Sequence, residues 1–160
     1  MNSVDVARGA VVGLVGGLLA AGAMSIAHRI LADLSPPAQS PPSTEPEDST
    51  VKVASAATRL VGYRLAEDQK AVAGSVVHYA FGAGVGAVYG AAVEIVPRVT
   101  TAFGLPFGVA VWLGAHVVAV PALGLAEPLT RQPIGKEAKE FGLHLVYGAV
   151  TELVRRSLQR

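Results

Sequence analysis

Cysteine is absent from this 160-residue chain, and both charged and aromatic residues are scarce. Without cysteine, the chain can form no disulfide bond, no thiolate-ligated metal site and no iron–sulfur cluster, and it has no cysteine nucleophile. Charged residues make up 16% of the sequence, against about 25% in an average soluble protein. The formal net charge of +1 also lacks the Lys and Arg excess typical of nucleic-acid-binding proteins, so we expect no such partner.

Recognisable catalytic motifs are missing as well. The sequence contains no G-x-S-x-G nucleophile elbow and no set of serine–lysine hydrolase motifs. Glycines at 82, 84 and 86 lie inside an apolar stretch with no preceding strand, so they do not form a phosphate-binding loop. We therefore expect a protein that is not an enzyme and that carries no cofactor.

Apolar residues dominate what is present. Hydrophobic residues make up 51% of the chain, and the mean hydropathy is +0.46. A membrane-spanning helix needs about 20 mostly apolar residues, and backbone polar groups in lipid must be satisfied within helices. The sequence therefore predicts one all-α integral membrane domain over residues 1–160, a four-helix transmembrane bundle in contact with the lipid bilayer. The expected spans are about 9–31, 71–96, 101–126 and 139–154.

The connection between the first two spans has two parts. Residues 35–48 are rich in Pro and Ser and predict a flexible, locally extended loop. From about 50 to 66, apolar residues such as Val53, Ala57 and Leu60 recur at helical spacing among Lys and Arg. This pattern predicts an amphipathic helix at the membrane surface. The alternative is a helix that packs on the protein itself.

Small residues recur every four positions in the predicted spans. The second span contains Gly82, Gly86 and Gly90 at this spacing, and the fourth contains Gly148. Small residues at such spacing let helix backbones approach closely in membranes, so these glycines predict helix packing. The same faces could instead join copies of the chain into a homo-oligomer.

Acidic and basic residues occur together near the ends of two spans. Glu94 precedes Arg98 by four residues, and Glu152 precedes Arg156 by the same interval. Such neighbours on a helix can form ion pairs. The first interpretation is charge pairing at the head-group level; the second is a polar path lined by these residues in a transporter or channel subunit.

Histidine occurs once in each predicted span. His78, His116 and His144 all fall in the half of the membrane opposite Glu94 and Glu152 if the four spans alternate in direction. Three interpretations stay open: hydrogen bonding to backbone or Tyr, a proton-sensitive cluster, and a His-ligated metal or haem site. No established metal-ligand spacing supports the third interpretation.

Several segments resemble one bacterial family. The stretches Val76–Gly82, Tyr89–Glu94, Val120–Leu125 and His144–Gly148, together with the ending Thr151–Arg156, are similar in order and spacing to the YagU-like family of small inner-membrane proteins. The resemblance covers roughly residues 51–156. It implies a multi-span helical protein of the bacterial inner membrane with a cytoplasmic C-terminus and no established reaction.

The leading functional expectation is a small multi-pass inner-membrane protein, responsive to envelope stress or pH through His78, His116 and His144. Four spans place both termini on one face, which carries Arg8, Arg98, Arg155, Arg156 and Arg160. The opposite face has more cations in raw number but far more chain. Because Arg155 and Arg156 lie directly at a helix end, where positive charge favours the cytoplasm, we expect both termini there.

Overall fold

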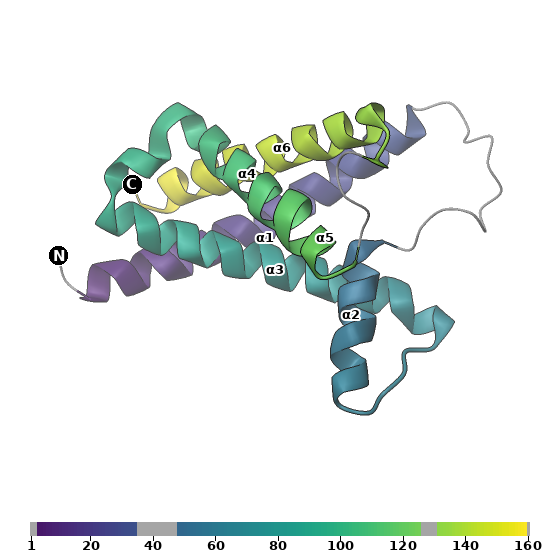
Figure 1. The fold of residues 1–160 in the computed structure, drawn as a ribbon. Coiled ribbons are helices and arrows are strands. Elements are labelled where there is room, and N and C mark those ends of the chain that lie inside the picture. The colour runs from purple at the N-terminus through teal and green to yellow at the C-terminus, as the bar shows by residue number, and fades with distance from the viewer. Residues whose placement is uncertain (1–2, 35–47, 126–130, 160) are drawn as a thin grey trace.

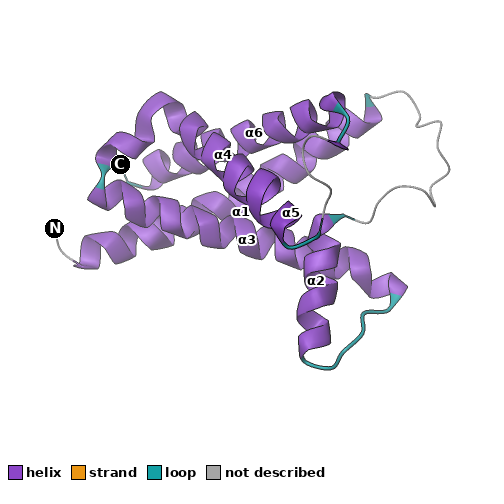
Figure 2. Ribbon diagram, viewed as in Figure 1, coloured by secondary structure: helices purple, strands orange, loops and turns teal. Residues whose placement is uncertain are grey.

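The computed structural model describes residues 3–34, 48–125 and 131–159, without the side chain of His116. All regular elements of this described part are helices, which confirms the all-α prediction for it (Figure 2). The flexible loop predicted over 35–48 lies, except for Asp48, outside the described residues. The helices are α1 (Ser3–Asp33), α2 (Ser49–Leu60), α3 (Glu67–Ile95), η2 (Pro97–Gly104), α4 (Leu105–Val111), η3 (Trp112–Ala119), α5 (Val120–Ala122) and α6 (Ile134–Leu158).

Three long helices, α1, α3 and α6, form the body of the molecule (Figure 1). Helix α1 contacts both α3 and α6, and α4 packs on α6. The beginning of α1, the 3₁₀ helix η2 and the end of α6 lie at one end of this bundle, which we call the terminal end (Figure 1). The first and last helices of the described chain thus have their outer ends at the same end of the bundle. This is the arrangement expected if the chain passes along the bundle an even number of times.

Three segments are long and apolar enough to cross a membrane: α1, α3 and the run from Pro97 to Ala122. Helical segments long and apolar enough to span a membrane thus occur at the first three expected spans. The fourth expected span, 139–154, lies within α6, which is less apolar and does not reach the same threshold.

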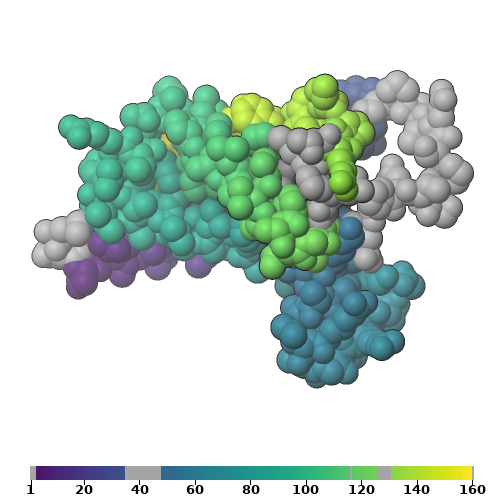
Figure 3. Space-filling model, viewed as in Figure 1, coloured from purple at the N-terminus to yellow at the C-terminus, as the bar shows by residue number. Residues whose placement is uncertain are grey.

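Helix α2 begins and ends through local chemistry. The Asp48 side chain accepts a hydrogen bond from the backbone N–H of Thr50 at 2.8 Å, which caps the helix. The helix ends at Leu60, earlier than the expected residue 66, because the chain turns at Gly62 with φ of +78°. Figures 1 and 3 show α2 running crosswise to α3 and projecting, with the loop after it, from one side of the bundle.

The third apolar segment is interrupted rather than continuous. Pro97 ends α3, and the chain turns through left-handed Ala102 and Phe103, with φ of 49° and 54°. Pro106 lies in the first turn of α4. Backbone N–H groups in a first turn have no partner within the helix, so the lack of an N–H in proline costs α4 no hydrogen bond. The π-helical η3 follows, and Pro121 lies directly after it in α5. A π-helical stretch this long is rare in proteins.

Candidate functional site

Glycine backbones bring α1 and α3 into direct contact. A Cβ atom built on Gly86 would lie 2.7 Å from the Cα of Gly17, and one on Gly90 would lie 2.8 Å from the Cα of Gly13. Real side chains do not fit at such distances, so only glycine permits this approach. The two stripes run antiparallel, with Gly9, Gly13 and Gly17 on α1 opposite Gly90, Gly86 and Gly82 on α3.

Helix α6 is joined to its neighbours in the same way. A Cβ on Gly148 would lie 2.6 Å from the backbone nitrogen of Gly108 in α4. On another side of α6, Gly16 of α1 lies against Thr151, where a Cβ would stand 3.0 Å from the Thr151 carbonyl oxygen. These contacts fix the position of the second half of α6 relative to α1 and α4.

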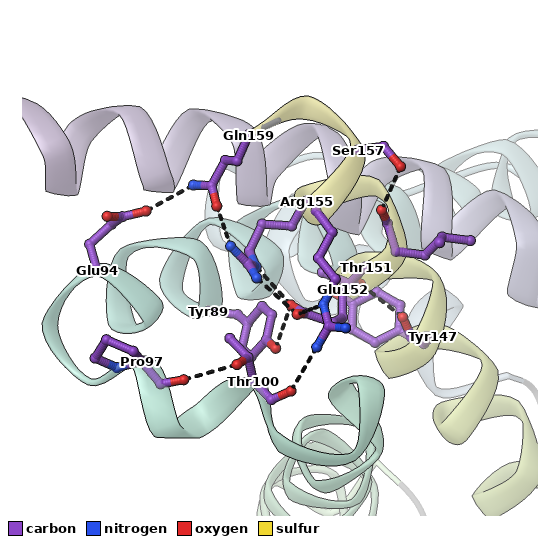
Figure 4. Close-up of polar contacts among 12 residues, drawn as sticks. Tyr89, Glu94, Pro97, Thr100, Tyr147, Thr151, Glu152, Arg155, Ser157 and Gln159 are labelled. Carbon is purple, nitrogen blue, oxygen red and sulfur yellow. Dashed lines mark hydrogen bonds and ion pairs between the residues drawn. The ribbon is translucent and has the colours of Figure 1, made fainter.

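The most unusual group that this packing encloses is the carboxylate of Glu152, whose residue has no exposed surface. Arg155 binds it with two parallel hydrogen bonds, from Nε to Oε2 at 2.7 Å and from Nη2 to Oε1 at 2.8 Å. Arg156 donates from Nε to Oε1 at 2.5 Å, and the Tyr89 hydroxyl donates to Oε2 at 2.9 Å (Figure 4). The carboxylate is therefore fully hydrogen-bonded as well as charge-compensated, which is what a buried ion requires.

Tyr89 reaches Glu152 from α3 because aromatic packing holds its ring. It stacks on Phe107 of α4 with ring centroids 4.1 Å apart and planes at 18°. Phe107 also contacts Tyr147 of α6, at 5.7 Å between ring centroids. The Tyr147 hydroxyl donates to the backbone carbonyl of Gly82 at 2.6 Å. Helices α3, α4 and α6 thus meet through three aromatic rings beside the carboxylate.

Arg156 extends this network to the turn between α3 and α4. Its Nη2 donates to the Thr100 carbonyl oxygen at 3.2 Å, and its guanidinium carbon lies 4.9 Å from the centre of the Phe103 ring. The turn holds two non-glycine residues in the left-handed region, a conformation that costs free energy and needs support from its surroundings. Arg156 supplies support through both a hydrogen bond and a cation–π contact.

Glu94 lies at the edge of the network. Its Oε1 accepts a hydrogen bond from Gln159 Nε2 at 2.8 Å, and Gln159 Oε1 accepts one from Arg155 (Figure 4). The expected Glu94–Arg98 pair is absent from the ion pairs of the described residues, and Arg98 is exposed in η2. The physical reason is Pro97, because α3 ends just before it and Arg98 lies in the next helix. Glu94 and Arg98 are therefore not one turn apart on a single helix, as the prediction assumed.

An open pocket of about 210 Å³ lies beside Glu94 at the terminal end. Its lining comes from the first turns of α1 and the last residues of α3 and α6, namely Asp5, Arg8, Glu94 and Gln159. The pocket is thus polar and carries charges of both signs.

The predicted histidines lie at separate contacts. His78 Nε2 lies 3.3 Å from the Ala21 carbonyl oxygen of α1, and His144 Nδ1 lies 2.7 Å from the Glu140 carbonyl oxygen of its own helix. A carbonyl can only accept, so each of these nitrogens donates. The side chain of His116 lies outside the described residues. Among the side chains that are described, no three His, Asp or Glu residues are grouped to hold a metal ion.

Sequence reasoning found Glu152 and Arg156 but not Tyr89, Arg155 or Gln159 as members of the site. Tyr89 could have been predicted as a member of the site, because a Tyr inside an apolar stretch needs a hydrogen-bond partner for its hydroxyl. It lies about 9 Å before the end of α3, at about 1.5 Å per residue, which is close to the depth of Glu152 in α6.

Comparison with known proteins identifies a family for this chain. No curated protein and no solved structure matches the chain. Residues 31–153 match the family described as "Protein of unknown function (DUF1440)". The match includes Glu152 and Tyr89 but not Arg155 or the first 30 residues. It covers well over half of the 160 residues, and the chain therefore belongs to the DUF1440 family.

Proposed function

We propose that this chain is a non-enzymatic integral protein of the bacterial inner membrane that crosses the bilayer four times, with both termini in the cytoplasm. The observation that carries the proposal is the burial and full compensation of Glu152 within α6. A helix whose charges are satisfied inside the bundle can cross lipid even when its sequence is only moderately apolar.

The outward face of α6 supports this crossing. Its large exposed hydrophobic residues are Ile134, Val146, Leu153 and Leu158, whereas Glu137, Glu152 and Arg155 are buried. Leu143 and Tyr147 are buried as well, so α6 carries large apolar side chains on its outward side and on its inward side, which is unusual for a helix that faces water. Helix α6 also runs along α1, itself the most apolar of the three candidate spans.

The position of α2 agrees with a helix at the membrane surface. It lies crosswise to the long helices (Figure 1), with Leu60 90% and Val61 80% exposed near cationic Arg59 and Arg64. Apolar side chains next to cations are typical of helices that rest in the head-group region. Ala54 of the same helix is buried and α2 contacts α3, so α2 combines both interpretations drawn from the sequence.

The inner-membrane location and the orientation depend on two further arguments. The resemblance to the YagU-like family supports the inner membrane and a cytoplasmic C-terminus. Arg155 and Arg156 at the terminal end support the same orientation under the positive-inside rule. Arg8, which directly precedes the apolar run of α1, and Arg98 of η2 add further positive charge to that end.

The close helix contacts favour a binding or structural role over conduction. Between α1 and α3 the backbones touch at successive glycines, which leaves no room for a polar path at that interface. Glu152, a candidate for such a path, is committed to Tyr89, Arg155 and Arg156. Flux through proteoliposomes that is lost in Glu94→Gln and Glu152→Gln variants would support the transporter alternative instead.

The pH response through His78, His116 and His144 stays a prediction. The nitrogens of His78 and His144 that lie near carbonyl oxygens act as donors, as they would in a protonated ring. A pH-dependent change in helix packing that disappears after all three are replaced by Gln would establish it.

Single-cysteine labelling tests the proposed topology, because the chain itself has no cysteine and supplies its own unlabelled control. The variants are Tyr63→Cys, Arg98→Cys, Gly135→Cys and Ser157→Cys. In intact cells, a membrane-impermeant maleimide should label Tyr63→Cys and Gly135→Cys from the periplasm. The other two should label only after permeabilisation. If Gly135→Cys and Ser157→Cys label from the same side, α6 does not cross and the four-span proposal is wrong.

A further inference from the structure

The end of α2 and the turn after it carry apolar and cationic side chains that the described part of the chain leaves uncovered. We call this segment, residues 59–64, the α2 tip. Leu60 and Val61 are its most exposed apolar residues, and Gly62 turns the chain directly after them. Arg59 and Arg64 are exposed on either side of this pair, and neither guanidinium forms an ion pair with a described residue.

The first half of α2 is held on the bundle at two points. A Cβ built on Gly74 of α3 would stand 2.7 Å from Cγ2 of Val51, so the Val51 side chain packs directly on the α3 backbone. Lys52 Nζ donates to the carbonyl oxygen of Leu125, just after α5, at 2.9 Å. Because α2 is attached both to α3 and to the end of the third apolar segment, the position of the α2 tip follows from that of the bundle.

The place where α2 crosses α3 gives its height in the bilayer. Along α3, Gly74 lies about 31 Å from Ile95, the last residue of the helix, at about 1.5 Å per residue. This length matches the hydrocarbon core of a bilayer, which is about 30 Å thick. Lys70 precedes this stretch and Arg98 follows it, so charged residues flank both ends. Under the membrane placement proposed above, on which this step rests, α2 crosses α3 where the hydrocarbon meets the head groups.

From this crossing the α2 tip extends sideways. Leu60 lies about 13 Å beyond Val51 along the helix axis. Figures 1 and 3 show α2 and the loop after it projecting past the side of the bundle. At this height the space beside the bundle is occupied by lipid head groups and the first carbons of the acyl chains. The apolar pair and the two arginines are therefore at the level of both.

The acidic residues nearest in sequence leave the two arginines available for a ligand. Asp48 caps the other end of α2. Glu67 pairs with Lys70 at 2.7 Å. Asp68 lies exposed in the first turn of α3 and forms no ion pair with a described residue. Since Lys52 is bonded to a backbone carbonyl, Arg59 and Arg64 are the cations of α2 and its turn that can meet an external anion.

We propose that the α2 tip binds anionic phospholipids in the leaflet at the end of the bundle opposite the terminal end. Leu60 and Val61 enter the acyl-chain region, and Arg59 and Arg64 bind lipid phosphates, whose oxygens suit the planar guanidinium fork. In a zwitterionic lipid the ammonium of the head group already compensates the phosphate. An anionic lipid has no such internal cation, so the α2 tip selects phosphatidylglycerol over phosphatidylcholine.

The test places a fluorescent reporter at the α2 tip. Trp112 is the single tryptophan of the chain, so Val61→Trp combined with Trp112→Phe gives one reporter in the full-length protein. The protein is reconstituted in vesicles of brominated phosphatidylcholine that contain increasing fractions of phosphatidylglycerol. As this fraction rises, the tryptophan emission should shift to the blue and be quenched by the bromine atoms.

Substitutions of the cations test the anionic preference. Arg59→Gln and Arg64→Gln should each raise about fivefold the phosphatidylglycerol fraction that gives half-maximal quenching. This corresponds to about 1 kcal/mol for each cation near an anionic surface. Arg98→Gln, which removes an exposed cation of η2 at the terminal end, is the matched control and should leave the midpoint unchanged. Because all three arginines are exposed, none of the substitutions should lower thermal stability, so a loss caused by misfolding is recognised.

Three results would overturn the inference. Quenching that is equal at every phosphatidylglycerol fraction would show that the α2 tip does not select anionic lipid. A midpoint unchanged by Arg59→Gln and Arg64→Gln would show that these cations do not bind it. Blue-shifted emission without quenching would show that a second copy or another protein covers the α2 tip. The quenching does not depend on which side each end of α6 faces, so the labelling of Gly135→Cys and Ser157→Cys can fail without it, and the reverse.

Discussion

Gly86 of α3 and Gly17 of α1 face each other so closely that a Cβ on Gly86 would stand 2.7 Å from the Cα of Gly17. Their backbones are therefore in contact, without side chains between them. Two residues away on the same helix, Gly84 is exposed, and a Cβ there would meet nothing within 4 Å. This pair of glycines provides a matched test of how α1 and α3 are held together.

Gly86→Ala should destabilise the protein by about 1–3 kcal/mol, because backbone atoms of α1 must move to admit the methyl group. Gly84→Ala should be neutral or stabilise by up to about 1 kcal/mol, since alanine favours the helix and meets no obstacle. Equilibrium unfolding in mixed micelles of SDS and a mild detergent measures both. Equal stability of the two variants would contradict the close α1–α3 contact.

Glu152→Gln should destabilise the protein by about 3–5 kcal/mol, because it leaves the Arg155 and Arg156 guanidiniums without their anion in a buried site. Glu67→Gln is the matched control: Glu67 pairs with Lys70 at 2.7 Å, but its side chain is 87% exposed. Breaking that surface pair should cost less than about 1 kcal/mol. The same unfolding assay applies, and similar costs for both variants would show that the Glu152 carboxylate is not buried.

Tyr89→Phe removes one hydroxyl while keeping the ring that stacks on Phe107. Loss of a hydrogen bond to a charged acceptor should cost about 1.5–3 kcal/mol. Tyr63 offers the comparison, since its hydroxyl donates to Gln69 at an exposed position at 2.8 Å, and Tyr63→Phe should have little effect. A neutral Tyr89→Phe would mean that water replaces the hydroxyl and that the site is open to solvent.

Arg156→Lys keeps the positive charge but loses the planar fork that reaches Glu152, Thr100 and the Phe103 ring together. The turn over residues 97–104 should therefore open more often. Hydrogen–deuterium exchange of its amides should speed up several-fold, while exchange in α2 stays unchanged. Arg59→Lys, at an exposed position of α2, should alter neither segment. Unchanged exchange over 97–104 would show that the turn holds its left-handed residues without Arg156.

The sequence allowed the helical class and the first three spans to be predicted, because length and hydropathy alone decide those features. It also marked Gly82, Gly86, Gly90 and Gly148 as small-residue positions. It could not say which stripe lies against which, since every span carries one and spacing does not identify a partner. The opposition of Gly86 to Gly17 is a property of the assembled bundle.

The site was predicted only where its partners are close in sequence. Glu152 and Arg156 are one turn apart on a continuous helix, so their pairing could be expected. Tyr89 reaches the same carboxylate from 63 positions away, a pairing that no local pattern encodes. Glu94 bonds to Gln159 instead of the neighbouring Arg98, since Pro97 interrupts the helix between the two charged residues. The left-handed Ala102 and Phe103 carry no residue signal for that conformation beyond the following Gly104.

The glycine contact between α1 and α3 also bears on how the protein is made. Helix α1 leaves the ribosome well before Gly82–Gly90 have been synthesised, with α2 and a long connection in between. During that interval it has no partner for its glycine stripe. Its most apolar stretch has a mean hydropathy of 2.1, so under the proposed membrane placement α1 can reside in lipid alone. Under the same placement, docking of α1 waits until α3 has entered the bilayer beside it, so insertion of α1 and its docking are separate events in biogenesis.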